Sequence, residues 1–328
     1  MKRKTVEYGK YGYIFIAPFF IVFLIFQLYP LLYTFYLSFI EYKLENNIIT
    51  SPKFCGFDNF MDVLTAKKFE AGEIKRVWFD TPGIVAIRQT IIIWIVNFIP
   101  QILLALLLSA WFTDVSVKLK GQGAFKVMMF LPNIITASSI SVLFYNLFEN
   151  SGPMTILFRK LHLVPQDYNF MDEPVGTVGL IAFMQFWMWY GNTMIVLIAG
   201  ILGINPSLYE AAMVDGANST QQFFNITLPL LKPILQFSLV TSAIGGLQMY
   251  DIPSLFNVSK GTGGPFPSAA SNTVTMQIRS YAFNINGAQY GKAAALSVIL
   301  FICTLVISLV FFALTRDREP KQKHAVIR

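Results

Sequence analysis

Apolar residues gather in six long stretches, and segments rich in charged residues, glycine and proline separate these stretches. An α-helix of about twenty apolar residues is long enough to cross the hydrocarbon core of a membrane. The pattern therefore predicts an all-α membrane protein with about six transmembrane helices. We expect these helices near Tyr13–Ser38, Ala86–Trp111, Val127–Phe148, Val178–Leu202, Ile234–Tyr250 and Ala293–Leu314.

One polar segment, Glu210–Pro233, lies between the fourth and fifth apolar stretches and reads EAAMVDGANSTQQFFNITLPLLKP. Irregular backbone is not tolerated against lipid, so this segment belongs in water or against protein. We expect two short helices joined by a tight turn. The first should be capped by Asn205, carry Pro206 in its first turn, and stop at Gly216 in the left-handed conformation.

Capping and proline positions also predict where neighbouring helices begin and bend. Ser219 and Gln222 match the capping-box pattern that starts the second short helix. Pro229 should end that helix, and Pro132 should kink the third apolar stretch. Both expectations follow because proline lacks a backbone N–H and clashes with the preceding turn.

Composition and the scarcity of reactive residues narrow the class of protein. Of 328 residues, 55% are hydrophobic and 13% are charged, which excludes an ordinary soluble domain. The two cysteines and the two histidines lie too far apart for a disulfide or a metal pair, and no phosphate-loop or hydrolase motif is present. Most of the 31 phenylalanines fall in the apolar stretches, which disfavours nucleic-acid binding. We expect no catalytic residue, metal or cofactor in this chain.

The distribution of basic residues predicts the orientation in the membrane. Lys2–Lys4 precede an apolar run that is too long for a signal peptide and lacks a small-residue cleavage site, so we expect the first helix to be retained. Six helices place both termini and the Glu210–Pro233 segment on one face, which holds 13 Lys and Arg against six Asp and Glu. Basic residues in short connections mark the cytoplasmic side. We therefore expect both termini in the cytoplasm.

Three short patterns within the polar segment carry a family resemblance. They are Glu210-Ala211-Ala212, Asp215-Gly216-Ala217 and Ile226-Thr227-Leu228-Pro229. In order and spacing they resemble the EAA loop of permease subunits of binding-protein-dependent ABC importers, especially the carbohydrate group that includes the maltose and glycerol-3-phosphate permeases. The resemblance implies a type I ABC importer permease fold in a single domain, 1–328, with the EAA loop at 203–229. It also implies that Glu210, Ala211, Ala212, Asp215, Gly216 and Ala217 couple the chain to an ATPase.

The same resemblance implies an assembly. A second homologous permease subunit, two cytosolic ATPase subunits that bind ATP and Mg, and an extracellular or periplasmic sugar-binding protein would act with this chain. The substrate would be a sugar or oligosaccharide, and the chain would span the inner membrane of a bacterial cell several times, surrounded by lipid.

Two outward connections, 41–85 and 251–290, carry further resemblances. Gly56-Phe57-Asp58-Asn59-Phe60 resembles a GLDNF-like signature that follows the first helix in this family. Gly263, Gly264 and Pro265 resemble the GGP stretch of the loop that approaches the binding protein. The chain lacks the additional spans and the bulky outer insertion of the longer maltose-type subunits.

Polar and aromatic side chains within the fourth and fifth apolar stretches predict a substrate pathway. Amides and hydroxyls bind sugar hydroxyls, aromatic faces pack on sugar C–H groups, and polar residues inside a membrane usually face the bundle interior. By position, the residues that match substrate contacts in the maltose-type family are Gln185, Trp187, Met188, Trp189, Asn192, Ser242, Gln248 and Asp251, and Tyr250 lies beside them. Only Trp187 is clearly the same residue type.

Other interpretations stay open at this point. Tryptophan and tyrosine also form interfacial belts, and Gln, Ser and Thr also hold helices together. Asn97, Pro100, Gln101 and Asn133 are candidates for gating or packing only. As alternatives to an ATP-driven importer, the chain could be a secondary carrier or channel, or a membrane-embedded assembly factor. The identity of the sugar, and which of the two permeases holds its main site, are open.

Overall fold

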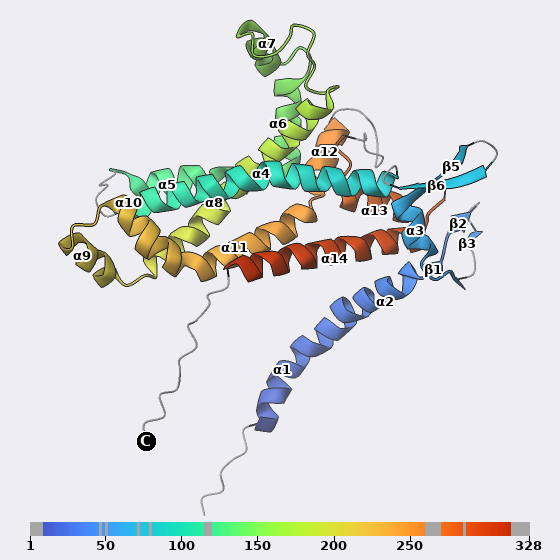
Figure 1. The fold of residues 1–328 in the computed structure, drawn as a ribbon, viewed down its shortest axis with the longest axis horizontal. Helices are drawn as coiled ribbons and strands as arrows, with labels where there is room; N and C mark the ends of the chain where they lie inside the picture. The colour runs from blue at the N-terminus through green and yellow to red at the C-terminus, as the bar shows by residue number, and fades with distance from the viewer. Residues whose placement is uncertain are drawn as a thin grey trace, which may run out of the picture. The chain divides into compact units, whose positions relative to one another are not determined.

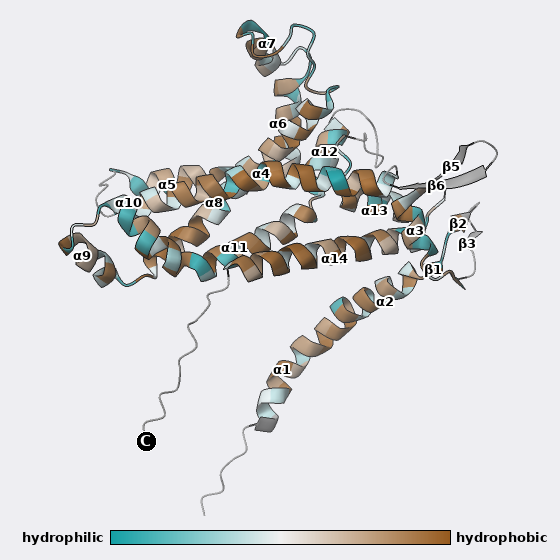
Figure 2. Ribbon diagram, viewed as in Figure 1, coloured by the Kyte–Doolittle hydropathy of each residue, from teal (hydrophilic) through white to brown (hydrophobic). Residues whose placement is uncertain are grey.

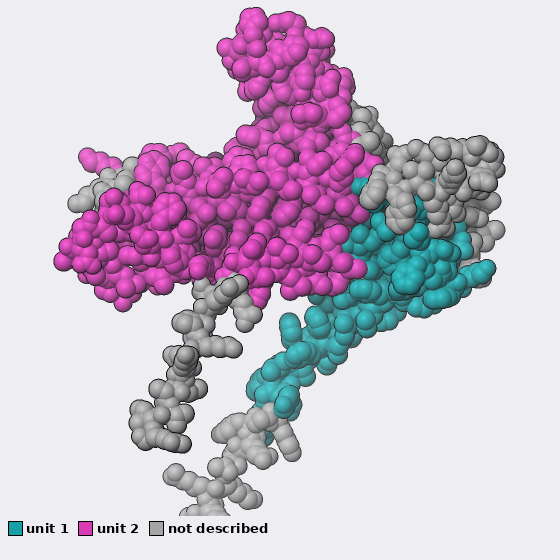
Figure 3. Space-filling model, viewed as in Figure 1, with its two compact units in different colours: residues 1–84, 278–299 teal, residues 85–277, 300–328 magenta. Residues whose placement is uncertain are grey.

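The computed structural model describes residues 9–45, 48–49, 52–70, 73–78, 81–114, 120–259, 270–284 and 287–315, which are mostly helical (Figure 1). These residues fall into two compact units (Figure 3). The first lies within 1–84 and 278–299, and the second lies within 85–277 and 300–328. The prediction of a single domain therefore remains a prediction.

The first unit begins with a long apolar helix and continues into short strands. Its helical elements are α1 (Gly9–Phe23), the π turn η1 (Leu24–Leu28), α2 (Tyr29–Ser38) and α3 (Asp58–Leu64). Three antiparallel pairs join β1 (Ile40–Glu41) with β4 (Lys53–Phe54), β2 (Leu44–Glu45) with β3 (Ile48–Ile49), and β5 (Thr65–Glu70) with β6 (Glu73–Trp78). These small strands in the connection 41–85 were not expected from the sequence.

Within the Gly56–Phe60 stretch of the first unit, Asn59 is the residue that anchors the chain. Its side-chain amide donates to the carbonyl oxygens of Ser38, at 3.0 Å, and Ile40, at 2.9 Å. These bonds satisfy backbone carbonyls at the end of α2, where the helical ladder has stopped. The stretch therefore fastens the loop to the end of the first membrane helix.

The second unit contains most of the remaining helices. They are α4 (Pro82–Thr113), α5 (Gln122–Phe130), the 3₁₀ turn η2 (Leu131–Ile134), α6 (Ala137–Phe148), α7 (Pro153–Lys160), α8 (Pro174–Leu202), α9 (Pro206–Val214), α10 (Ser219–Gln222), the π turn η3 (Phe223–Thr227), α11 (Leu228–Leu247) and α12 (Asp251–Ser259). Two further helices, α13 (Val274–Phe283) and α14 (Tyr290–Thr315), pass from one unit into the other, as α4 does after its first three residues.

Five of the expected transmembrane helices are long, apolar helices in the structure, and they are brown along most of their length in Figure 2. The third is different, because its two halves, Gln122–Ile134 and Ala137–Phe148, are bent by 90°. Pro132 lies in the 3₁₀ turn, and Thr136 is extended and caps α6 through the backbone N–H of Ser139. The predicted kink at Pro132 is thus confirmed and is a break between two helices.

Pro229 does not end the helix that contains it, so this expectation was wrong. The π turn η3 directly precedes it, and α11 continues through Pro229 to Leu247. The same arrangement recurs in the first unit, where η1 precedes Pro30 in α2. A π turn is wider than an α turn, which accommodates the proline ring and its missing N–H without breaking the helix.

The core of the second unit surrounds α8. Met184, Met194 and Leu197 of α8 are fully buried, as is Leu231 of α11. Gly191 allows the close approach of α5 and η2, since a Cβ there would lie 2.6 Å from the carbonyl oxygen of Met129. Close packing therefore holds α8 in the centre of this unit.

Candidate functional site

The helices α8 and α11 carry two candidate sites, one in the connection between them and one along their length. We call the connection, Gly203–Thr227, the elbow. The chain leaves α8, forms α9 and α10 in the elbow, and returns through η3 into α11 (Figure 1). The first short helix forms as predicted. Asn205 accepts a hydrogen bond from the backbone N–H of Ser207, and Pro206 occupies the first turn of α9.

Gly216 ends α9 in the left-handed conformation, with φ of 80°, as predicted. The backbone N–H of Ala217 donates to the carbonyl of Ala212, at 2.9 Å, which closes the end of the helix. The predicted capping box was wrong by one residue, since it joins Asn218 with Gln221 rather than Ser219 with Gln222. Asn218 has the extended backbone that an N-cap needs, while Ser219 is already helical.

A hydrogen bond of 2.8 Å between the hydroxyls of Tyr209 and Thr227 ties α9 to η3. The side chains on the outer face of the elbow are mostly exposed to solvent. Glu210, Ala211, Asp215 and Gly216 are exposed, and Ala212 and Ala217 are half-buried. Large apolar side chains beside them are exposed as well, most of all Val214 at 88%. This surface can accept another protein.

Farther from the elbow, beside the middle of α8 and the second half of α11, lies a cavity of about 460 Å³. Eight of the nine residues predicted for the substrate pathway line it, namely Gln185, Met188, Trp189, Asn192, Ser242, Gln248, Tyr250 and Asp251. The ninth, Trp187, is not among the lining residues. It is half-buried and packs against Phe144, with ring centroids 6.0 Å apart.

A third helix, α4, contributes to the cavity wall through Asn97 and Gln101. The Gln101 amide donates to the hydroxyl of Thr193 on α8, at 2.9 Å, and its oxygen accepts from Ser242 on α11, at 3.4 Å. Gln101 thus bridges all three helices. The sequence marked both α4 residues as polar groups within a membrane helix, but their position on the cavity required the folded structure.

The cavity lining is polar and almost uncharged. Among the described residues that line it, Asp251 is the only one with a charged side chain at neutral pH, and it is exposed at the start of α12. Amides, hydroxyls, Trp189 and Tyr250 provide the other functional groups. This mixture can bind uncharged hydroxyl groups and apolar ring faces. No cluster of metal-ligating side chains occurs in the described part of the chain.

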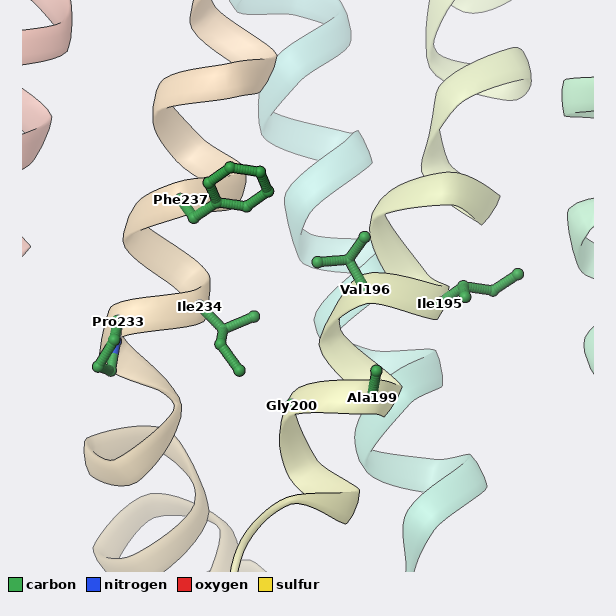
Figure 4. A pocket seen from close by; sticks show the side chains of 7 residues that line it. All are labelled: Ile195, Val196, Ala199, Gly200, Pro233, Ile234 and Phe237. Carbon is green, nitrogen blue, oxygen red and sulfur yellow. The ribbon is translucent and has the colours of Figure 1, made fainter. Parts of the chain in front are cut away.

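A second hollow, which we call the groove, lies between α8 and α11 closer to the elbow (Figure 4). It measures about 520 Å³, and all of its lining side chains are apolar. Figure 4 shows Ile234 reaching from α11 towards α8. Val196 and Phe237 line both the groove and the cavity, so the two hollows meet at these residues.

Three residues predicted to face the binding protein, Gly263, Gly264 and Pro265, lie outside the described residues. The part of the connection that follows them is anchored by two hydrogen bonds within the second unit. Thr273 donates to the carbonyl of Met249, and the backbone N–H of Val274 donates to Thr90. The role predicted for the three residues stays a prediction.

Comparison with known protein families identifies one match over most of the chain. Residues 84–324 match the family described as the binding-protein-dependent transport system inner membrane component. The matched range covers α4 to α14 and includes both the elbow and the cavity.

Individual relatives match nearly the full chain. A lactose transport system permease protein from Rhizobium radiobacter is 30% identical, with 95% of this chain and 96% of the relative aligned. A trehalose/maltose transport system permease protein from Thermococcus litoralis is 29% identical, with 95% of each chain aligned. Among solved structures, a chain of a bacterial ABC transporter that imports the acidic polysaccharide alginate has a TM-score of 0.67 at 22% identity, covering 95% of this chain and 97% of its own. The last likeness establishes a shared fold.

Proposed function

Because the chain belongs to the family of inner membrane components of binding-protein-dependent transport systems, we propose that it is a permease subunit that passes a neutral saccharide through the membrane in an ATP-driven importer. The cavity between α4, α8 and α11 carries this proposal. It is large enough for sugar residues, and its lining offers amides, hydroxyls and aromatic faces.

The chemistry of the lining favours an uncharged sugar. A carboxylate at Asp251 repels an anionic ligand, and no Lys or Arg among the described lining residues offsets it. Trp189 is 47% exposed and presents an aromatic surface on which a sugar ring can pack. The structural neighbour handles an acidic polysaccharide, but one fold serves different substrates through different side chains.

The importer requires subunits beyond this chain. We propose a second homologous permease beside it, two cytosolic ATPase subunits that bind ATP and Mg, and an extracellular sugar-binding protein. The sequence supports ATP binding by separate subunits, because this chain contains no phosphate-loop motif. The chain would reside in the cytoplasmic membrane of a bacterium, with both termini and the elbow in the cytoplasm.

Coupling follows from the position of the elbow on the same two helices that wall the cavity. An ATPase seated on Glu210, Ala211, Ala212, Asp215, Gly216 and Ala217 would move α9, and the Tyr209–Thr227 hydrogen bond would carry the movement into η3 and α11. Such a movement changes the access to the cavity only if the partners bind its two states with different affinity. The outward connections, including Gly263–Pro265, would receive the binding protein.

Uptake by proteoliposomes that contain the complete complex tests the function. Radiolabelled lactose, maltose and trehalose should enter only when ATP, the ATPase subunits and the binding protein are all present. An ATPase variant that binds but does not hydrolyse ATP serves as the control and should abolish uptake. Uptake driven by a proton or sodium gradient without the ATPase would overturn the proposal in favour of a secondary carrier.

Site-directed cross-linking tests the coupling surface. In a background where Cys55 and Cys303 are replaced by serine, Val214→Cys on the elbow should cross-link to the ATPase. Val175→Cys is a matched control, because this valine is also highly exposed, at 80%, but lies at the opposite end of α8. Cross-linking of Val175→Cys and not of Val214→Cys would contradict the proposed orientation.

A further inference from the structure

The seam between α4 and α11 holds a set of polar groups, of which only Ser242 belongs to the substrate pathway predicted from α8 and α11. On α4, Trp94, Asn97 and Gln101 follow one another at intervals of three and four residues, which places them on one helix face. Facing them on α11, Ser238 and Ser242 lie one turn apart. Asn97, Gln101, Ser238 and Ser242 all line the cavity.

Two of these side chains are satisfied by hydrogen bonds within the protein. Gln101 donates to Thr193 and accepts from Ser242, so its amide is engaged on both sides. Its role is to hold α4, α8 and α11 together at this level. Gln101 and Ser242 therefore form a fixed frame around the remaining groups.

Within the residues that the structure describes, Ser238 has an unpaired side chain, unlike Gln101 and Ser242. The residue is only 5% exposed, yet its hydroxyl has no hydrogen-bond partner among the described residues. Asn97, also 5% exposed, donates to the carbonyl of Ile93 at 3.0 Å, and within the same described ranges no partner occurs for its side-chain oxygen. Buried polar groups are nearly always hydrogen-bonded, so unpaired ones on a cavity wall indicate a ligand that completes them.

The indole N–H of Trp94 is likewise buried and has no hydrogen-bond partner in the described part of the chain. Trp94 is held by its ring contacts with Phe98 and Phe311, whose centroids lie 5.0 Å and 6.2 Å away. Gly246 separates it from the cavity, and a Cβ at Gly246 would lie 2.8 Å from the indole nitrogen. Glycine at this position therefore keeps the polar edge of Trp94 close to the cavity wall.

We propose that Ser238, Asn97 and Trp94 form a hydroxyl-binding subsite that extends the sugar pathway from α8 and α11 onto α4. The ligand class is a neutral saccharide whose separate hydroxyls meet these groups, because Ser238 lies eight residues, about 12 Å along α11, from Gly246 beside the Trp94 indole. Ser238 can donate and accept, Trp94 donates only, and the free oxygen of Asn97 accepts. This inference rests on the proposed function, because it assigns further contacts within the same cavity.

A cycle of variants and deoxy sugars tests the subsite in the complete complex in proteoliposomes. The probe is whichever of lactose, maltose and trehalose the wild-type complex takes up fastest, together with its monodeoxy analogues. Ser238→Ala should lower uptake of the parent sugar by about two- to tenfold, the range expected for one hydrogen bond. For one analogue, the variant and the wild type should be equal, because the bond is already missing. Comparing the two proteins with the same binding protein cancels the selectivity of that component.

Two controls separate recognition from structure. Ser141→Ala removes a fully buried hydroxyl on α6 that already donates to the carbonyl of Ala137, so it should leave the selectivity among analogues unchanged. Ser238→Thr keeps the hydroxyl and should retain the discrimination of the wild type. Trp94→Phe keeps an aromatic ring against Phe98, deletes the N–H, and should lose discrimination at a single sugar position as well.

The outcomes distinguish the two levels of the proposal. If Ser238→Ala and Trp94→Phe lower uptake of the parent sugar and all analogues by the same factor, or leave it unchanged, the subsite is refuted while the transport function stands. If the wild-type complex shows no ATP-dependent uptake of any of the three sugars, the proposed function itself fails.

Discussion

The two ends of the α8–α11 pair differ in what they present. At the elbow end, exposed side chains include Glu210, Asp215 and Val214, and the backbone turns sharply at Gly216. At the cavity end, neutral amides, hydroxyls and aromatic rings surround a hollow with one carboxylate at its margin. Between them lies the groove, whose lining side chains are all apolar.

This difference separates two tasks on one pair of helices. Charged and apolar groups on an open surface suit a protein partner, whereas uncharged polar groups in a hollow suit a small hydroxylated solute. Changes at the elbow should therefore alter the link between ATP hydrolysis and transport without altering sugar selectivity. Changes at the cavity should do the reverse.

The largest effect is expected from Glu210→Lys at the elbow. Reversing this exposed charge would place repulsion where we propose that the ATPase docks, so uptake should fall by about 30-fold or more. ATP hydrolysis by the complex should persist, and the ratios of uptake among lactose, maltose and trehalose should be unchanged. Altered ratios would remove the separation between the two ends. Glu210→Gln, which only deletes the charge, should have a smaller effect.

A second elbow variant, Gly216→Val, acts through the backbone. No atom would obstruct a side chain at Gly216, but its φ of 80° is strained for any β-branched residue. Distorting the turn between α9 and α10 should lower uptake by about tenfold. Gly216→Asn is the matched control, because asparagine adopts the left-handed conformation more readily. Equal uptake by the two variants would show that the left-handed turn is not needed.

The neighbouring tryptophans of α8 test the cavity end. Trp189→Ala removes an exposed ring that lines the cavity and should lower sugar uptake by about two- to tenfold while ATPase association is retained. Trp187→Ala removes a ring that packs against Phe144 and should chiefly lower the unfolding temperature in detergent. A larger loss of sugar selectivity in Trp187→Ala than in Trp189→Ala would place Trp187 in the pathway after all.

The smallest effect is expected from Tyr209→Phe, which deletes the hydrogen bond between α9 and η3. One such bond contributes about 0.5–1.5 kcal/mol. Because the elbow should become looser, the number of sugars imported per ATP hydrolysed should fall modestly, which paired transport and hydrolysis assays measure. Thr227→Val should give the same result, and the double variant should add nothing further. Additive losses would mean that the two hydroxyls act separately.

The elements with strong local signals were predictable from the sequence. The apolar stretches located the long helices, and Asn205, Pro206 and Gly216 located α9, because each of these residue types has a specific backbone preference. The effect of proline on helix continuity was not predictable in the same way. Pro132 breaks its helix, whereas Pro30 and Pro229 follow π turns and do not. The proline alone does not encode the preceding turn, so this distinction required the structure.

The site was predictable along α8 and α11 but not across helices. Trp187 and Trp189 are the same residue type in the same apolar stretch, so the sequence does not distinguish them. The orientation of α8 decides which ring faces the cavity. Asn97 and Gln101 lie about ninety residues before their neighbours on α8, and Gln101 meets Thr193 across a separation of 92 residues. No local pattern carries that information, because it depends on the packing of α4 against the other two helices.

The π turn at Phe223–Thr227 has a consequence for the length of the chain between elbow and cavity. Such a turn holds one residue more than an α turn, and each residue of a helix rotates the following side chains by about 100°. Deleting one residue within the π turn would restore an ordinary α turn and keep the register of α11, whereas inserting one residue into α11 before Ser238 would rotate Ser238 and Ser242 relative to Glu210. We expect a one-residue insertion between Pro233 and Ser238 to abolish transport, even though every side chain at either end is kept, and a one-residue deletion within Phe223–Thr227 to be better tolerated.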